Sequence, residues 1–384
     1  MRVANVFVFL LLCTGIGYSQ GTVPNAELQN LAPPSSPAFV LMDITPSNII
    51  IPENVQAFSI QTINAFTGNS EAANGNYAVE VQPYWYVKRE NMNFFTYNNL
   101  TSSKSQISTV DDYDGMNVFG DIWKKASFSL ALMNGTFEVF EESQSFISVG
   151  ARTRLLSLRT KKQIKKHIDD FKKQHTRYLQ FMRSQEVSNI FANSSLSSAE
   201  KNEKVTTLQE FIAIQNDFGE VIQSKPFFAL DMALAYSHFL GDKSRGFEDT
   251  MGRFGIWASG DLALYTPTIG KNSYVHFYGI FRYLRDGINL EENGTELFSV
   301  DKLDFGGKIE LEFDRLSFAY EFIKRDSDMD EGSRSIGSIR YRINDSFAIH
   351  GGFGENFRSG GTTVALFGIQ WGLENNSSVR LSPN

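Results

Sequence analysis

Five histidines are the side chains of this sequence best suited to acid–base or metal chemistry: His167, His175, His238, His276 and His350. A serine hydrolase needs a serine beside an oriented histidine, and a zinc protease of the common type places two histidines on one helical face. Neither a Gly-x-Ser-x-Gly nor a His-Glu-x-x-His sequence occurs. His276 and His350 fall on the polar side of alternating segments, where a histidine is more often a hydrogen-bonded filler. We therefore expect neither an enzyme nor a cofactor.

Charged side chains recur at every second position of several segments, which would place them on one face of a sheet. We predict that six acidic residues, six basic residues and two histidines line a shared interior: Glu80, Arg152, Arg154, Asp231, Asp261, His276, Arg282, Lys308, Glu310, Glu312, Glu321, Arg340, Arg342 and His350. Such a lining could select solutes by charge. Equal numbers of the two signs favour mutual pairing over selection, because a selective pore would more often carry a surplus of one sign.

Two further charged segments invite a binding interpretation. The loop from Asp326 to Glu331 alternates acidic side chains but lacks the glycine and the distal glutamate of a full calcium loop, so we expect no metal. A later helical segment is basic, and its lysines are candidates for contact with an anionic partner or lipid surface: Lys161, Lys162, Lys165, Lys166, Lys172 and Lys173. Pairing with the acidic second half of that segment is the competing interpretation.

The elements that must position these residues are strands, because the dominant signal is an alternation of period two. Between Lys302 and Phe313, apolar residues occupy one face and mainly charged residues the other. We predict about twelve such strands: 56–66, 76–88, 126–133, 145–156, 227–239, 253–265, 273–284, 302–313, a strand beginning at 316, 334–343, 346–354 and 362–373. Several approach the roughly 9–11 residues that a tilted membrane strand needs.

Residues 158–223 break this alternation. Ile164, Ile168 and Phe171 recur at steps of three and four, as do Leu208, Phe211 and Ile212 beyond a polar break. We predict two antiparallel helices joined by a polar turn. Ser198 is followed three residues later by Lys201, so no acidic residue marks the start of the second helix.

The N-terminus has the pattern of a secretory signal. Arg2 precedes an apolar run from Val6 to Cys13, and small residues at Gly17 and Ser19 suggest cleavage before Gln20. The predicted organisation is a signal peptide at 1–19, an irregular leader at 20–55, a β-barrel at 56–373 interrupted by the 158–223 insert, and a polar tail at 374–384. Cys13 is the only cysteine, and the net charge of −7 argues against a nucleic-acid partner.

The exported chain, its aromatic-rich alternating strands and the absence of cysteine beyond residue 13 together resemble bacterial outer-membrane β-barrel proteins. The junction at Ser19–Gln20 and the abundance of Asn and Phe resemble envelope proteins of Bacteroidota. The resemblance covers roughly 56–373 and implies an antiparallel transmembrane barrel in contact with outer-membrane lipid. The sequence departs from the family in its last strand, which ends near Trp371 and is followed by a polar tail.

Two functions remain open at this point. One is a porin-like narrow channel for small polar solutes, and the other is a scaffold barrel that docks a periplasmic or cell-wall protein through its helical insert. In such barrels short turns face the periplasm and longer loops face outwards. Counted back from the last strand, this alternation predicts that the insert lies on the periplasmic side.

Overall fold

The computed structural model describes residues 37–41, 48–50, 77–86, 93–106, 109–135, 144–222, 224–240, 250–268, 270, 273–290, 297–327, 329, 331–344, 347–355, 357 and 363–371. The expected signal peptide, the expected strand at 56–66 and the polar tail lie outside these residues. No helix in the described ranges is long and apolar enough to cross a membrane.

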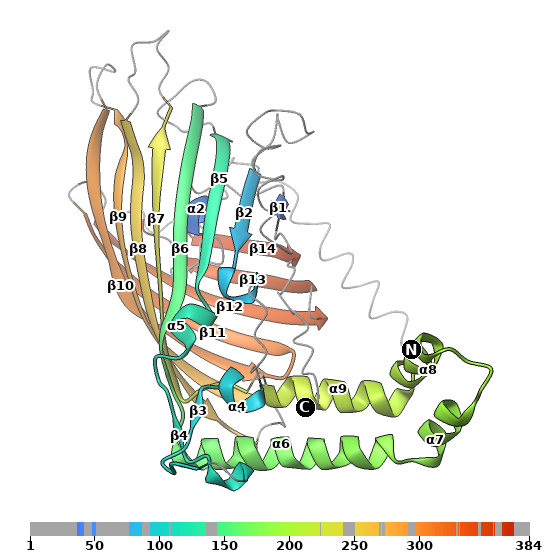
Figure 1. Cartoon of the computed structure of the whole chain (residues 1–384). Coiled ribbons are helices and arrows are strands. Elements are labelled where there is room, and N and C mark those ends of the chain that lie inside the picture. The colour runs from blue at the N-terminus through green and yellow to red at the C-terminus, as the bar shows by residue number, and fades with distance from the viewer. Residues whose placement is uncertain are drawn as a thin grey trace, which may run out of the picture.

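A twelve-stranded sheet dominates the molecule (Figure 1), with the spatial order β1-β2-β5 to β14. Its strands are β1 (Asn48–Ile50), β2 (Tyr77–Val81), β5 (Ser127–Gly135), β6 (Gln144–Leu158), β7 (Phe228–Phe239), β8 (Thr250–Tyr265), β9 (Ser273–Leu290), β10 (Leu297–Phe313), β11 (Leu316–Ser327), β12 (Gly332–Asn344), β13 (Phe347–Glu355) and β14 (Thr363–Trp371). All neighbours pair antiparallel except β1 and β2, which pair in parallel. The predominantly antiparallel β architecture is therefore confirmed.

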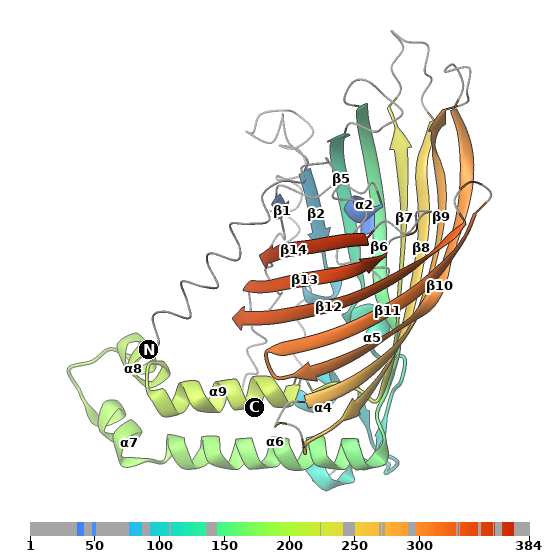
Figure 2. The same ribbon diagram turned by 180° about the vertical axis from the view of Figure 1, so that it is seen from behind.

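The sheet curves strongly, so that β11 to β14 cross behind the earlier strands in Figure 1 and in front of them in Figure 2, which is seen from the opposite side. Within the described residues it stays open, because β14 pairs only with β13 and β1 only with β2. Its inner face carries α2 (Pro37–Val40), which packs against β5, β6 and β7. Its outer face carries the apolar side chains of the alternating pattern, including Phe305, Ile309 and Phe318, each more than 40 % exposed.

Two predictions for the N-terminal half need correction. The 20–55 leader is not wholly irregular, because it contains α2 and β1. The strand predicted at 76–88 ends at Val81 and is followed by a short 3₁₀ helix, η4 (Pro83–Tyr86). Pro83 lacks the N–H that a further ladder hydrogen bond would need, which accounts for the early end.

The insert between β6 and β7 contains four helices where two were predicted: α6 (Lys161–Met182), α7 (Gln185–Ala192), α8 (Ser198–Thr206) and α9 (Gln209–Ile222). Ser184 caps α7 and so interrupts the first predicted helix. The expected absence of a capping box was also wrong, because Ser197 and Glu200 form one at the start of α8. We call α6 to α9 the hairpin, since α6 packs against α9 and α7 against α8.

A small unit precedes β5 and lies between the sheet and the hairpin. It comprises α4 (Phe94–Tyr97), β3 (Leu100–Thr101), η5 (Val110–Asp112), β4 (Gly115–Met116) and α5 (Asp121–Lys124). Phe94 stacks on Phe171 of α6 at 4.0 Å between ring centroids, within an apolar cluster that also contains Leu100 and Ile164. This cluster fixes the base of the hairpin against the end of the sheet.

Candidate functional site: the filled inner face

The end of the inner face away from the hairpin is apolar and holds α2. Ala38 and Leu41 are buried against Phe146, Trp257 and Leu284 in one cluster. The Ala38 N–H donates to Ser129 Oγ at 3.1 Å, and Arg253 Nη1 donates to the Leu41 carbonyl at 3.3 Å. Hydrogen bonds with β5 and β8 therefore hold both ends of this short segment.

Gly150 and Gly255 give α2 the space to approach the wall. A Cβ at Gly150 would lie 2.5 Å from the Ala38 nitrogen, and one at Gly255 would lie 2.9 Å from Leu41 Cδ1. Real Cβ atoms do not make the first of these contacts with backbone. The position of α2 on the inner face thus depends on a glycine in β6.

The middle of the inner face carries paired charges. Asp304 is fully buried and accepts hydrogen bonds from Arg282 Nε and Arg325 Nε, both at 2.7 Å. On neighbouring strands, Arg334 Nε lies 3.0 Å from Glu321 Oε1. Buried charges persist in proteins when they are paired in this way.

A further ion pair joins the early strands of the sheet. Arg152 Nη2 on β6 lies 2.9 Å from Glu80 Oε1 on β2, and Arg152 Nε also donates to Ser127. Nearer the hairpin, Arg154 Nε donates to Asp231 Oδ1 at 2.8 Å, and Lys308 pairs with Glu310 at 3.0 Å. The inner face therefore carries compensated charge from β2 to β10.

His276 occupies the hairpin end of the inner face, and its side chain is almost completely buried. Its Nδ1 lies 2.8 Å from Asp261 Oδ1 and its Nε2 lies 3.2 Å from Glu312 Oε2, while Lys225 also pairs with Glu312. Both ring nitrogens are therefore engaged with carboxylates. A histidine held on both sides has no free nitrogen with which to take a proton from a substrate.

A second histidine, His167, lies where the hairpin joins the sheet. Its Nδ1 is 2.9 Å from Ser224 Oγ, to which Arg159 Nη1 also donates at 3.0 Å. Burial, together with the nearby Arg159 charge, lowers the pKa of His167 to about 3. The neutral ring packs beside Phe94 at 4.9 Å. The serine–histidine pair is thus part of the junction between hairpin and sheet.

The structure brings together most of the residues predicted to line the interior. Eleven of the fourteen carry an inner-face ion pair: Glu80, Arg152, Arg154, Asp231, Asp261, His276, Arg282, Lys308, Glu310, Glu312 and Glu321. Arg342 donates to the Asp314 carbonyl, Arg340 is exposed on the same face, and the side chain of His350 lies outside what the structure describes.

Several residues that form ion pairs on the inner face were not predicted from the sequence. Asp304 already stood on the polar side of the alternating 302–313 segment, so its place was predictable. Arg325 and Arg334 flank the loop between β11 and β12, where the alternation is weaker, and Lys225 lies between α9 and β7, where there is none. No period-two pattern could have assigned Lys225 to the inner face.

The predicted partner-binding lysines share the solvent-facing side of α6. Lys161, Lys162, Lys165, Lys166 and Lys173 are exposed, whereas Lys172 is half-buried and pairs with Asp111. Lys166 Nζ also lies 4.2 Å above the Tyr265 ring.

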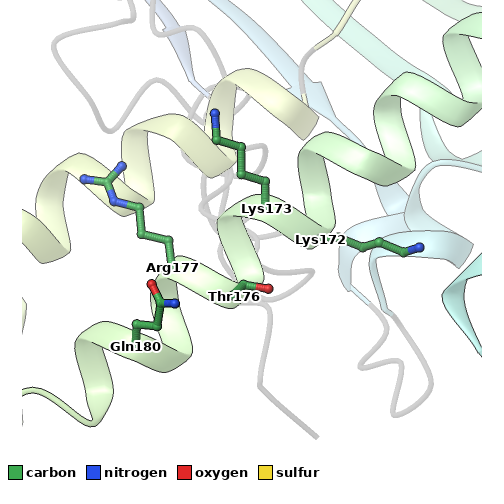
Figure 3. Close-up of a pocket in the computed structure, with 5 residues that line it drawn as sticks. All are labelled: Lys172, Lys173, Thr176, Arg177 and Gln180. Carbon is green, nitrogen blue, oxygen red and sulfur yellow. The ribbon is translucent and has the colours of Figure 1, made fainter.

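A shallow cavity of about 530 Å³ opens on α6 (Figure 3), lined by Lys172, Lys173, Thr176, Arg177 and Gln180. Arg177 is already paired with Asp217 of α9 at 2.6 Å. Lys173 therefore supplies most of the unpaired positive charge that lines this cavity, because it forms no ion pair with the described residues.

Comparison with family models, with curated proteins and with solved structures gives no match to this chain.

Proposed function

We propose that this protein is an outer-membrane β-barrel with a filled interior, and that it acts as a scaffold that docks an envelope partner through its hairpin. The observation that carries the proposal is the inversion of the two sheet faces. Exposed apolar side chains form an outer band: Val149, Leu234, Tyr236, Leu264, Phe277, Phe281, Phe305, Ile309, Leu311, Phe318, Tyr320, Phe322, Ile339, Tyr341 and Phe353. The buried face holds the charges, which is the reverse of a water-soluble sheet.

The height of this apolar band fits a bilayer. On β10 the outward positions from Leu303 to Phe313 span ten residue steps, or roughly 33 Å at about 3.3 Å per residue. A strand tilt of about 45° reduces this to roughly 23 Å, close to the ~25 Å apolar belt of outer-membrane barrels. Beyond the band, Asp301 and Arg285 are both about half exposed and 4.0 Å apart, as expected outside the hydrocarbon region.

The proposed barrel requires the two edge strands of the sheet, β1 and β14, to pair with each other. Antiparallel pairing alternates strand direction from β14 back to β2, so β14 runs in the same direction as β2 and β1. A single parallel junction between β1 and β14 would complete the barrel. A closed sheet would leave no unpaired edge in lipid, where each unpaired backbone group costs several kcal/mol.

The filled interior favours a scaffold over the narrow channel. The α2 segment occupies the apolar end of the inner face, and ion pairs occupy the middle. Planar-bilayer recordings of the purified protein test this directly. We expect no stable conductance steps, whereas reproducible steps in the unmodified protein would favour the narrow channel for polar solutes.

The hairpin is the feature that supports docking. It leaves the sheet at the same end as the tight turns β10–β11 and β12–β13, each with two intervening residues, which supports its placement in the periplasm. Lysine and arginine are concentrated on α6, whereas α8 carries equal numbers of acidic and basic side chains and the charged side chains of α9 are all acidic. The exposed lysines of α6 favour a partner with a negatively charged surface.

Charge reversal tests docking separately from conductance. Lys162→Glu, Lys165→Glu and Lys173→Glu in one chain should abolish salt-sensitive binding to purified cell-wall sacculi, a carboxylate-rich probe. Lys201→Glu with Lys204→Glu on α8 is the control, because it changes the charge in the same direction away from α6, and it should leave binding intact. Equal binding by both variants would contradict docking through the lysine side of α6.

A further inference from the structure

The segment 117–126, which contains α5, has an inside-out distribution of polarity. Phe119 is 60 % exposed and Trp123 is 72 % exposed, whereas Asp121 and Lys124 are buried, with only 8 % and 6 % of their surface exposed. A segment surrounded by water would place these residues the other way round. The segment therefore faces something other than water.

The buried polar groups are fully engaged with the neighbouring unit. Asn99 Nδ2 donates to Asp121 Oδ1 at 2.6 Å, and Lys124 Nζ donates to the carbonyls of Thr96 and Tyr97 at the end of α4. Asp121 and Lys124 lie 3.8 Å apart. The inward side of α5 thus has specific partners, and its exposed aromatic side has none from this chain among the described residues.

Several backbone N–H groups of the segment are also hydrogen-bonded within the chain. Gly120, Ile122, Lys125 and Ala126 donate to carbonyls three or four residues earlier, and Asn117 donates to the Asn99 carbonyl. Each of these pairings removes a backbone group that would be costly to leave unsatisfied beside lipid.

The position of the segment explains why it exists. Pairing between β5 and β6 ends at Ser127 and Arg152, although β6 continues to Leu158. Beyond Arg152, on the edge of β6 that β5 no longer covers, the Ser157 N–H donates to the Val118 carbonyl at 2.9 Å, and the Thr153 hydroxyl donates to the Ile122 carbonyl. Residues 117–126 therefore take the place that a longer β5 would have occupied.

We infer that residues 117–126 form a lipid-facing piece of the wall, with Phe119 and Trp123 at the boundary between headgroups and acyl chains. The inference rests on the proposed membrane barrel. The bilayer is the occupant because α5 packs against β6 next to the outer band, in which Phe128 of β5 and Val149 of β6 are each nearly half exposed. Tryptophan is enriched at that boundary.

Quenching by brominated lipids tests the inference. The full-length protein is reconstituted in vesicles whose lipids carry bromine near the headgroup or near the end of the acyl chain. Subtracting the fluorescence of Trp123→Phe from that of the unmodified protein isolates the Trp123 signal. We expect that signal to be lost most strongly with bromine near the headgroup.

A reporter in the outer band separates the two proposals. Ile309→Trp in the Trp123→Phe background should be quenched by bromine near the end of the acyl chain if the sheet spans the bilayer. A quenched Ile309→Trp reporter with an unquenched Trp123 would overturn the inference, because α5 would then face water or protein and not lipid. Loss of quenching at both positions would instead contradict the membrane barrel itself.

Discussion

The loss of unfolding free energy on replacing Asp304 by asparagine shows how far water is excluded from the inner face. The carboxylate of Asp304 is fully buried and receives hydrogen bonds from two guanidinium groups, those of Arg282 and Arg325. Asparagine keeps the shape and one carbonyl acceptor but removes the negative charge that Asp304 places between them. Breaking a buried ion pair by neutralising one partner typically costs about 3–5 kcal/mol. Since one acceptor remains, we expect a loss of about 3 kcal/mol, or more than a hundredfold in the folding equilibrium.

The matched control lies on the same strand. Asp301 is three residues earlier on β10 and points outwards, with its side chain 55 % exposed and 4.0 Å from Arg285. Exposed pairs of this kind contribute about 0–1 kcal/mol, so Asp301→Asn should be nearly neutral. Urea-induced unfolding in detergent micelles, followed by tryptophan fluorescence, gives both free energies of unfolding. Losses below about 1 kcal/mol for both variants would refute the reasoning, because they would mean that water screens Asp304 as it screens Asp301.

Three further results follow from the structure. Ile309→Arg should impair insertion into lipid vesicles by roughly 2–4 kcal/mol, while Lys308→Gln on the opposite face should not, and equal tolerance of both would favour a soluble sheet. Gly150→Val should displace α2, so that a cysteine replacing Ala38 reacts with a thiol reagent; Gly279→Ala, where a Cβ meets no atom within 4 Å, should leave it protected. The pKa of His167 is about 3 in the folded chain, against an ordinary 6.5. Between these two pH values the unfolded chain therefore binds a proton at His167 that the folded chain does not bind. Stability at the hairpin base should therefore fall by about 1.4 kcal/mol per unit as pH drops from roughly 6.5 towards 3, and hydrogen exchange of α6 should lose that dependence in His167→Gln.

The sequence was most informative where two environments act on one segment. Every second residue of 302–313 meets a different medium, so the pattern predicted the faces of β10 and the inner positions of Lys308, Glu310 and Glu312. A single pattern also predicted the helical insert, because the apolar side of α6 packs on α9 and on the cluster around Phe94.

The rest depended on contacts that leave no local period. The α2 segment is four residues long, and its position follows from glycines and an arginine more than a hundred residues away in the sequence. The unit around α5 is built from short helices and two-residue strands, whose buried polar groups contradict any assignment by hydropathy. Tertiary hydrogen bonds, such as that from Asn99 to Asp121, decide its orientation.

Both ends of the hairpin are held to residues of the sheet by side-chain contacts. On entry, Lys166 of α6 lies over Tyr265, the last residue of β8. On exit, Lys225 pairs with Glu312 near the end of β10, and Glu312 also faces His276 of β9. Arg159 and His167 meet at Ser224, which joins the two ends to each other. A partner bound to α6 would therefore be connected through these contacts to several strands of the sheet at once. That combination suits an anchoring scaffold, whereas a channel for polar solutes would gain nothing from closing its own interior.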